Sequence, residues 1–560
     1  MFLPTTKAEL DTLGWTALDI ILVSGDSYID SPFIGVAVIG RVLHDAGFRV
    51  GIIAQPNVQN SRDITRLGEP RLFWGVTGGS VDSMVANYTA TGRKRRSDDF
   101  TPGGVNNRRP DRATIVYSNL IRKFFKNTCP IVLGGVEASL RRVAHYDSHS
   151  DKIRRSILFD AKADYLLYGM ADQSVVHLAQ RIRDSKSVED LRGLCYISAE
   201  VKKGSIELPS FDEVASDKQA FTDMFHAFYQ NNDHLTGDTL AQRQDTRYLI
   251  QNPPAPPLTQ KELDRVHELD YKLEQHPYYR KRGRVKALET IRFSLVTHRG
   301  CYGECNFCGI TVHQGWTVTW RSTASILREA RRLVGRPDFK GIISDVGGPT
   351  ANMYGFECKK KLTKGMCPDK RCLHPEICRT LKVDHSPQMR LLEQLRKLDG
   401  VRKVFVASGI RHDMVLADKK HGPAYLQQVV QHHVSGQMKL APEHSEDAVL
   451  NLMGKPDQQS LVEFRRMFLE ATKKAGKKQF LTYYLIAAHP GCSDEDMKKL
   501  KKFVGSVLKL NPRQVQVFTP LPSTWSAVMY HTGKDPFTGR PLKVIKDIAG
   551  KVRQKSILQN

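Results

Sequence analysis

Short apolar segments alternate with helical segments along two separate stretches of this chain, and this alternation constrains the fold more than any other feature. The first stretch contains five apolar runs, at residues 18–24, 48–54, 71–77, 130–135 and 164–169. Strands that alternate with helices favour a mostly parallel sheet covered by helices on both faces. Residues 1–195 are therefore predicted to form a doubly wound, Rossmann-like α/β domain.

The alternation weakens between residues 196 and 286, where the proline-rich "NPPAPPLT" at 252–259 indicates an extended boundary. We expect this region, with one helix, to be a connector. From 287 to 535 the alternation returns, with apolar runs at 289–297, 339–346, 401–408, 436–441, 477–488 and 513–519. Six βα units predict a partial (β/α)6 barrel with its chemistry at the C-terminal ends of the strands. Residues 536–560 are expected to form a short basic tail.

Composition narrows the class of protein. No run of eighteen apolar residues occurs, so no membrane span is expected, and the N-terminus lacks the pattern of a signal peptide. We therefore expect a cytoplasmic protein, in which the ten cysteines are ligands or free thiols. The net charge of +25 is compatible with a nucleic-acid partner and equally with an ordinary basic surface. The most basic stretch, residues 91–112, is predicted to be a long polar loop.

Three cysteines lie together in "RGCYGECNFCGI", residues 299–310, directly after the first strand of the second alternation. Cys301, Cys305 and Cys308 have the spacing C-x3-C-x2-C. A structural zinc site needs four protein ligands, and a 4Fe–4S cluster usually takes four thiolates. Three thiolates on a four-iron cluster would leave one iron open to bind and reduce a small molecule. A zinc loop with a distant fourth ligand, or unliganded thiols, are the alternatives.

This motif, after the first strand of a βα barrel, resembles the signature of radical SAM enzymes. The resemblance implies that the open iron binds the amino and carboxylate groups of S-adenosylmethionine (SAM). It further implies that one electron from the cluster cleaves the sulfonium to methionine and a 5′-deoxyadenosyl radical, which abstracts hydrogen from a substrate.

Other strand ends carry further elements of this resemblance. Gly347, Gly348 and Pro349 in "DVGGPT" are similar to the superfamily's GGE-like turn, which binds the amino group of SAM, although the acidic third residue is absent. Glu443 and Ser445 in "KLAPEHS" are candidate contacts to the ribose or carboxylate of SAM. Arg411 and Asp413, at the end of the third strand, are further polar candidates, with an ordinary ion pair as the alternative.

Four segments, "GDSYIDSPFIG", "GGVEASLRR", "LVTHRGCYGECNFCGI" and "MKLAPEHS", are similar to the YgiQ family of radical SAM proteins. The resemblance implies an N-terminal domain like those that bind cobalamin, with its turn at Gly134-Gly135. The D-x-H-x-x-G motif that displaces the base of cobalamin is not found, so cobalamin stays one candidate ligand. A reductase or flavodoxin-type electron donor is expected as a partner, and no substrate is implied.

A second group of thiols, Cys358, Cys367, Cys372 and Cys378, lies in an insertion at residues 355–380. The segment is rich in lysine and poor in apolar residues, so it could hardly fold without a metal. Four ligands would complete a zinc site or a second iron–sulfur cluster, and reduced surface thiols are the alternative.

The sequence thus predicts a radical SAM enzyme of unknown substrate. One alternative is an RNA- or tRNA-modifying enzyme of the methylthiotransferase type, which the positive charge favours, although only a short stretch follows the last barrel segment. The other alternative is a non-catalytic iron–sulfur sensor or binding protein. A seat for SAM argues against this second alternative, because a sensor has no need of one.

Overall fold

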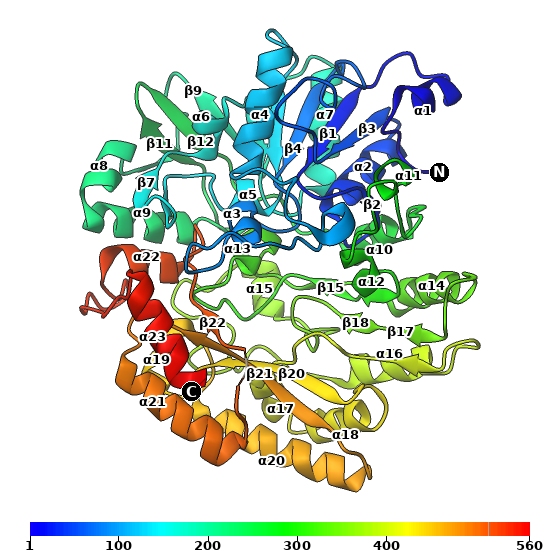
Figure 1. Cartoon of the computed structure of the whole chain (residues 1–560). Helices are drawn as coiled ribbons and strands as arrows, with labels where there is room; N and C mark the ends of the chain where they lie inside the picture. The colour runs from blue at the N-terminus through cyan, green and yellow to red at the C-terminus, as the bar shows by residue number, and fades with distance from the viewer. Residues whose placement is uncertain (513, 560) are drawn as a thin grey trace. The chain divides into compact units, whose positions relative to one another are not determined.

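Strand β1, Ile20–Ser24, is buried along its whole length, as its unbroken run of apolar residues predicts for a strand covered on both faces. The structure is a computed structural model, and it describes residues 1–512 and 514–559 (Figure 1). The chain divides into two compact units. Unit 1 comprises Met1–Leu258 and Arg265–Arg292, and unit 2 comprises Thr259–Asp264 and Phe293–Asn560. Arg513, the first residue of the sixth run predicted for the barrel, and Asn560, the last of the predicted tail, lie outside the described residues.

Unit 1 is built on a nine-stranded sheet in the order β10-β11-β12-β9-β8-β5-β4-β1-β3. The strands of this sheet are β1, β3 (Val50–Ala54), β4 (Phe73–Thr77), β5 (Ile131–Gly134), β8 (Tyr165–Leu167), β9 (Leu194–Ser198), β10 (Ile206–Leu208), β11 (Leu240–Gln244) and β12 (Arg247–Gln251). The short pairs of this unit are β2 (Ile29–Asp30) with β13 (Glu274–Gln275), and β6 (His145–Asp147) with β7 (Lys152–Arg154).

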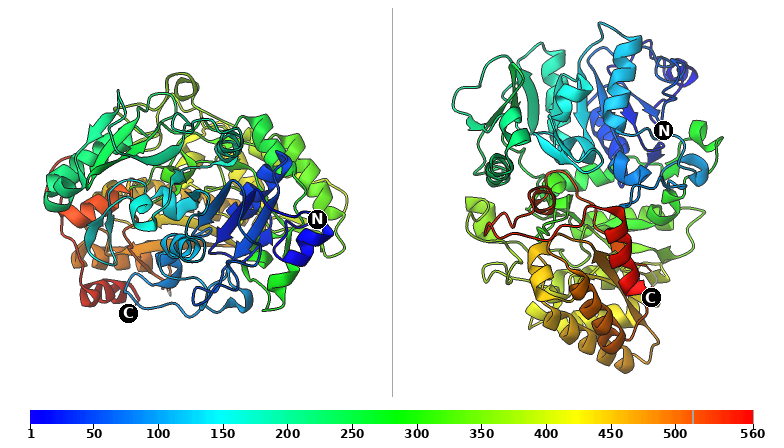
Figure 2. Two further views of the ribbon diagram at one scale, coloured as in Figure 1. Left: turned by 90° about the horizontal axis from the view of Figure 1, so that it is seen from above. Right: turned by 60° about the vertical axis from the view of Figure 1, so that its left-hand side comes forward.

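The five predicted strands of unit 1 are confirmed, and they pair in parallel in the order β3-β1-β4-β5-β8. Helices cover both faces of this part (Figures 1 and 2). Side chains of α2 (Gly35–Asp45) and α7 (Asp172–Arg183) pack with Ile20 and Leu22 in one core. The unit's other helices are α1 (Lys7–Thr12), α3 (Ser83–Asn87), α4 (Ala113–Phe124), α5 (Gly135–Ser139), α6 (Ile157–Ala161), α8 (Phe211–Ser216), α9 (Lys218–Gln230), α11 (Pro277–Arg280) and α12 (Ala287–Ile291), with the 3-10 turn η1 (Pro102–Gly104). Helix α10 (Gln260–Glu268) spans the boundary between the two units.

The prediction of a parallel sheet is only partly correct, because the other half of the sheet is mixed. β9 lies antiparallel to β8 and β12, and β11 and β12 form an antiparallel hairpin. These strands come largely from residues 196–286, which we expected to be a connector. Their buried positions include glutamines, and Gln242 and Gln244 accept hydrogen bonds from the backbone N–H groups of Ala144 and Ser156. The polar side chains hide the strands from a search for apolar runs.

Unit 2 contains the six strands predicted for the second alternation. They are β14 (Ser294–Val296), the interrupted second strand β17 (Ile342–Ile343) and β18 (Asp345–Gly347), β19 (Lys403–Val404), β20 (Gln437–Glu443), β21 (Phe480–Ala487) and β22 (Gln516–Val517). Each pairs in parallel with the next in chain order, with a single bridge, Ile410 to Leu440, joining the third and fourth. Their carboxyl ends therefore share one edge.

Helices of unit 2 lie outside these strands (Figure 1). They are α13 (Ile310–Gln314), α14 (Thr323–Val334), α15 (Lys359–Lys364), α16 (Ser386–Arg396), α17 (His412–Ala417), α18 (Gly422–His432), α19 (Asp447–Met453), α20 (Gln458–Lys474), α21 (Asp494–Phe503), the π-helical turn η2 (Val504–Leu508), α22 (Trp525–Thr532) and α23 (Ile548–Gln559). A further short pair joins β15 (His298–Arg299) to β16 (Thr319–Trp320).

The expected C-terminal tail is largely structured. Gln554 of α23 donates hydrogen bonds to the carbonyl of Cys492 and to Asp494, and accepts one from the N–H of Ala488. None of the helices in the described part of the chain has the length and apolar character that crossing a membrane requires.

Candidate functional site

The loop with the three cysteines begins at a position where only glycine fits. Gly300 has φ +83°, and a Cβ there would lie 2.3 Å from the carbonyl oxygen of Thr317. Further along, the N–H of Asn306 bonds to Met453 and its side chain to Leu452, at the end of α19. The loop is therefore fixed at both ends within unit 2.

Cys301, Cys305 and Cys308 are brought together on this loop. Burial, with the nearby Cys305 as the next cause, raises the pKa of the Cys308 thiol to about 12. Burial also raises the pKa of Cys301, again with Cys305 as the next cause. Cys301 and Cys308 therefore ionise only when a positive charge or a metal stabilises the thiolates.

The backbone of Gly303 lies next to the thiols of Cys301 and Cys305. Throughout residues 1–512 and 514–559, no group of three or more His, Cys, Asp or Glu side chains is gathered tightly enough to hold one metal ion. Thiolates bound to separate irons of a cluster stand further apart than the ligands of one ion. Gly303 keeps the space between the thiols open, since a Cβ there would lie 3.2 Å from Cys301 Sγ and 3.6 Å from Cys305 Sγ.

The second predicted element, Gly347 to Pro349, lies beside this loop. Gly347 ends β18 and its carbonyl accepts a hydrogen bond from the N–H of Thr297, which precedes the cysteine loop. The hydroxyl of Thr350 is 3.6 Å from Cys301 Sγ. A Cβ on Gly348 would lie 2.6 Å from the buried ring of His298. Sequence reasoning missed Thr350 and His298, although both adjoin motifs that it identified.

The third strand contributes Arg411, a buried guanidinium at the start of α17. Its Nη1 is 3.7 Å from Cys305 Sγ, and its Nε donates to Asp413 at 2.9 Å. Although burial opposes it, Asp413 together with Cys305 raises the pKa of Arg411 above its ordinary value. The side chain of Asn352 bonds to both the N–H and the carbonyl of Arg411 and so fixes its backbone. Arg411 and Asp413 are thus an ion pair that also reaches the cysteine loop.

The fourth strand ends at Glu443, which has φ +70° and is buried. Burial raises the pKa of this carboxyl above its usual range, and Lys455, whose Nζ is 3.7 Å away, opposes the rise. Burial and Cys305 raise the pKa of Cys308 and Lys455 opposes this rise, so Lys455 lies within electrostatic reach of that thiol. Ser445 is buried, and its hydroxyl donates to Glu446.

Three strand ends of unit 2 and the segment after α19 therefore supply groups to one set of thiols. The first strand end supplies the cysteine loop, the second Thr350 and the third Arg411, and the segment after α19 supplies Lys455. Three thiols, with hydrogen-bond donors and cations around them, fit a 4Fe–4S cluster.

Unit 1 offers its own strand edge, where cobalamin was a candidate ligand. Parallel sheets of this order bind ligands where the strand order reverses, here between β1 and β4. The chain's own side chains fill this position. Arg109 is fully buried and bonds to the carbonyl of Gly78, to Asp26 and to Asp98. A Cβ on Gly25 would lie 2.1 Å from the carbonyl oxygen of Gly78. Arg109 and its two aspartates thus occupy the position between β1 and β4 where a ligand of unit 1 was expected.

Family models match both parts of the chain. A model described as Radical SAM N-terminal matches residues 2–294, and one described as Radical SAM superfamily matches residues 295–504. Their boundary lies close to the boundary between the two units.

Similar proteins match over nearly the full length. A UPF0313 protein of Fusobacterium nucleatum is 54% identical over 558 residues, with 100% of this chain and 98% of that protein covered. A UPF0313 protein of Thermotoga petrophila is 50% identical, covering 99% and 97%, and one of Methanocella arvoryzae is 47% identical, covering 99% and 92%.

Two solved structures share the fold at low sequence identity. One is the radical SAM methyltransferase TsrM from Kitasatospora setae, solved with cobalamin and a [4Fe-4S] cluster; the TM-score is 0.52 at 14% identity, over 92% of this chain and 78% of that one. The other is the cobalamin-dependent radical enzyme OxsB, solved with aqua-cobalamin and SAM; the TM-score is 0.53 at 11% identity, over 97% and 66%.

Proposed function

Because this chain belongs to the UPF0313 family of radical SAM proteins and is an enzyme with a 4Fe–4S cluster and SAM as cofactors, we propose that Cys301, Cys305 and Cys308 ligate the cluster. When bound, the cluster supplies one electron that breaks a carbon–sulfur bond of SAM, giving methionine and a 5′-deoxyadenosyl radical. The observation that carries this proposal is that three strand ends of unit 2 and the segment after α19 bring groups to the three thiols.

The groups around the thiols would seat SAM. Gly347, Gly348 and Pro349 present backbone beside the loop, as an amino acid's ammonium and carboxylate groups require. Glu443 is buried with its charge only partly compensated by Lys455, so it is suited to accept hydrogen bonds from a hydroxyl or an ammonium group. Ser445 is a weaker candidate, because its hydroxyl already donates to Glu446.

A single thiol provides the test. Cys305→Ala removes one proposed ligand, and we expect it to abolish the release of 5′-deoxyadenosine from SAM under reducing, anaerobic conditions. Cys129→Ala is the matched control, because Cys129 is also a half-buried free thiol but lies in unit 1. Far-UV circular dichroism of both variants shows whether they are folded. Continued formation of 5′-deoxyadenosine by folded Cys305→Ala would refute the assignment.

We also propose the finer features of this type of enzyme. The six parallel strands of unit 2 support a partial (β/α)6 barrel, because each pairs with the next in chain order. The YgiQ-like segments support a YgiQ-type protein, and ten free cysteines support a cytoplasmic location. The chemistry requires an external reductant, for which a reductase or flavodoxin-type protein is the proposed partner.

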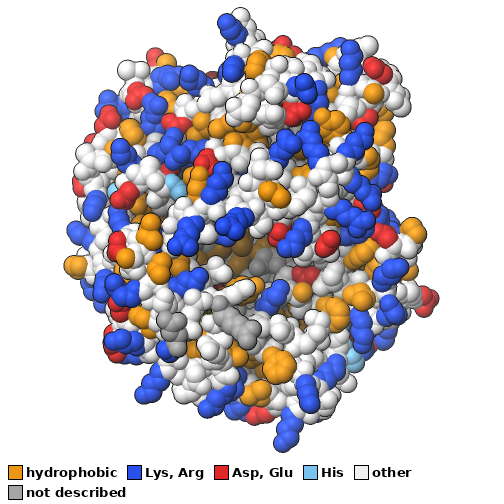
Figure 3. All heavy atoms as spheres, viewed as in Figure 1, with side chains coloured by type: hydrophobic (Ala, Val, Ile, Leu, Met, Phe, Trp, Pro, Cys, Tyr) orange, Lys and Arg blue, Asp and Glu red, His pale blue; other side chains and the backbone are white. Residues whose placement is uncertain are grey.

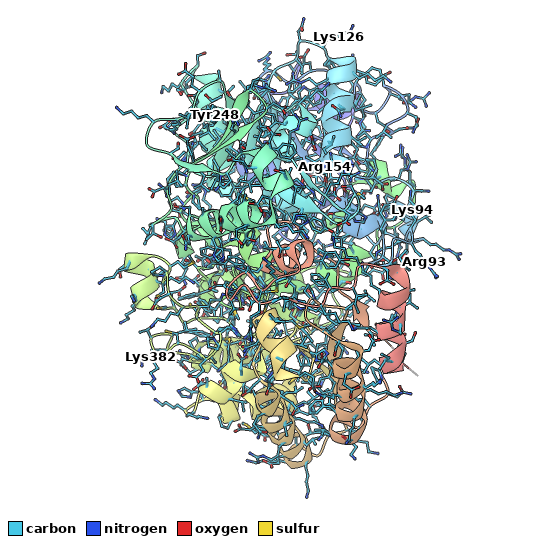
Figure 4. The ribbon with its side chains drawn as sticks, turned by 90° about the vertical axis from the view of Figure 1, so that its left-hand side faces the viewer. Arg93, Lys94, Lys126, Arg154, Tyr248 and Lys382 are labelled. Carbon is cyan, nitrogen blue, oxygen red and sulfur yellow. The ribbon has the colours of Figure 1, made fainter. Side chains whose placement is uncertain are left out.

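RNA modification is the alternative that the net charge favours. Figure 3 shows Lys and Arg side chains scattered over the visible face, with acidic side chains among them, rather than gathered into one stripe. Arg93 and Lys94, labelled in Figure 4, belong to the basic segment 91–112 and are both exposed. Salt-dependent binding of tRNA to the protein would support this alternative, and the absence of such binding would count against it. A non-catalytic sensor would bind the cluster but release no 5′-deoxyadenosine.

A further inference from the structure

The cysteine-rich insertion of unit 2 brings two of its four thiols to one hydroxyl group and the backbone of a third to the same turn. The hydroxyl of Thr380 is 3.6 Å from Cys358 Sγ and 3.1 Å from Cys378 Sγ. The N–H of Cys378 bonds to the carbonyl of Cys372, which brings the third thiol's backbone to the same turn. Cys372 packs against the hydrophobic cluster that contains Cys358. None of these thiols forms a disulfide.

A buried cation lies against this group of thiols. Lys361, on helix α15, is only 3% exposed. Its Nζ donates to the carbonyl of Trp316 at 2.8 Å and to Cys372 Sγ at 3.6 Å. A buried ammonium group is costly unless an anion compensates it, and a metal-bound thiolate is such an anion. A donor to a ligating sulfur also tunes an iron–sulfur cluster.

The insertion contains little regular secondary structure. Between residues 355 and 380 the only helix is the six-residue α15, and many of its side chains are exposed lysines. Even so, Cys358 is buried and Leu373 and Leu381 pack beside it in one cluster. A cross-link through metal would hold these segments in place where apolar burial is small.

We propose that Cys358, Cys372 and Cys378, with Cys367 from the loop after α15, ligate a second iron–sulfur cluster. A cluster fits better than zinc because four thiolates on one zinc ion lie about 2.3 Å from it. Here the sulfurs of Cys358 and Cys378 lie 3.6 and 3.1 Å from the hydroxyl of Thr380, which allows a separation larger than that of two ligands of one ion, and the described residues contain no grouping tight enough for one ion.

The second cluster would lie close to the first. Tyr302, which follows Cys301, belongs to the same hydrophobic cluster as Cys358, and its hydroxyl donates to the carbonyl of Phe356 at 2.8 Å. Cys301 and Cys372 both pack against that cluster, and the Lys361 ammonium is 5.8 Å from the centre of the Tyr302 ring. The proposed second iron–sulfur cluster thus has different ligands from the first, but both sets of ligands pack against the same group of apolar side chains.

The test leaves the insertion intact and removes the first cluster. The full-length variant Cys301→Ser/Cys305→Ser/Cys308→Ser is reconstituted anaerobically with iron and sulfide. We expect about four irons and four sulfides per chain to remain, with an electron paramagnetic resonance signal on reduction. Adding Cys372→Ser to that variant should remove the bound iron and the electron paramagnetic resonance signal. Adding Cys129→Ser, in unit 1, should remove neither of them.

Two results would overturn the inference: a folded triple variant that binds no iron, or stoichiometric zinc in the protein as isolated that iron does not replace. The test is separate from that of the proposed function. If the wild-type protein releases no 5′-deoxyadenosine but the triple variant keeps its iron, the second cluster stands alone. If the wild-type protein cleaves SAM with only about four irons per chain and the triple variant holds none, the function stands and the second cluster does not.

Discussion

The ring of His298 occupies the space into which a side chain at residue 348 would project. A Cβ on Gly348 would lie 2.6 Å from both Cε1 and Nε2 of that ring. The ring cannot easily give way, because Nδ1 is bonded to the hydroxyl of Thr297 at 2.8 Å and the residue is fully buried in β15. We therefore predict that Gly348→Ala destabilises unit 2 by about 1–3 kcal/mol, the usual cost of overpacking.

A double-mutant cycle tests whether the ring is the cause. In a His298→Ala background the ring is gone, so Gly348→Ala should cost little, and the coupling energy should be on the order of 1–2 kcal/mol. The assay is urea unfolding followed by circular dichroism. Gly335→Ala is the matched control, because Gly335 ends α14 with φ −69° and a Cβ there would meet nothing closer than 3.7 Å.

The same cycle separates stability from the binding of SAM. If Gly348 matters only because its backbone must approach SAM, weak SAM binding should persist in the double variant even when stability returns. If instead the new methyl group of Gly348→Ala pushes the ring of His298 into the SAM-binding position, the double variant should recover SAM binding as well as stability. An equal cost of Gly348→Ala in both backgrounds would refute the steric argument.

Three further predictions follow from buried charges. Arg411→Met leaves Asp413 without its partner and should cost about 3–5 kcal/mol in urea unfolding, with much of the loss restored by adding Asp413→Asn; a cost below about 1 kcal/mol would contradict the pairing. Although burial opposes it, hydrogen bonds from His385 and from the N–H of His421 hold the pKa of Asp418 below its usual range, so its stabilisation is complete above the unfolded value of about 4 and is lost as the pH falls. The advantage of wild type over Asp418→Asn, about 1.5–3 kcal/mol at pH 7, should therefore shrink below about pH 4, and a constant difference would exclude this cause. Hydroxocobalamin should not co-elute with the protein in gel filtration, because the buried pairing of Arg109 with Asp26 and Asp98 occupies the edge between β1 and β4; one bound cobalamin per chain would contradict this.

Much of the fold could be predicted from the sequence because its central strands are buried on both faces. Such strands are continuous apolar runs, as in β1 and β3, and they stand out between helical segments. The hairpin of β11 and β12 could not be found in this way. Its glutamines are buried but satisfied by hydrogen bonds to distant backbone groups, such as the N–H of Ala144, which no local pattern reveals.

The candidate site was predictable where residues adjoin a motif and unpredictable where they reach it from elsewhere. The spacing of Cys301, Cys305 and Cys308 pointed to the loop directly. Lys455 lies after a helix that follows the fourth strand, and only the folded chain brings it near Cys308 and Glu443. Its type and position are ordinary for a surface lysine, so composition and periodicity contain no signal for its role.

The two cations near the thiols are each paired with a carboxylate of their own. Arg411 bonds to Asp413, and Lys455 lies next to Glu443, so both cations are compensated before any thiol ionises. This is consistent with a loop that folds with protonated, half-buried thiols, since Arg411 and Lys455 each have a carboxylate partner. With a cluster bound to the thiolates, Arg411 could donate to Cys305 Sγ, 3.7 Å from its Nη1, and the charge of Lys455 would act on Cys308. Arg411 and Lys455 therefore have a negatively charged partner whether the thiols are protonated or bound to a cluster. The fold must position these two cations before the cluster binds.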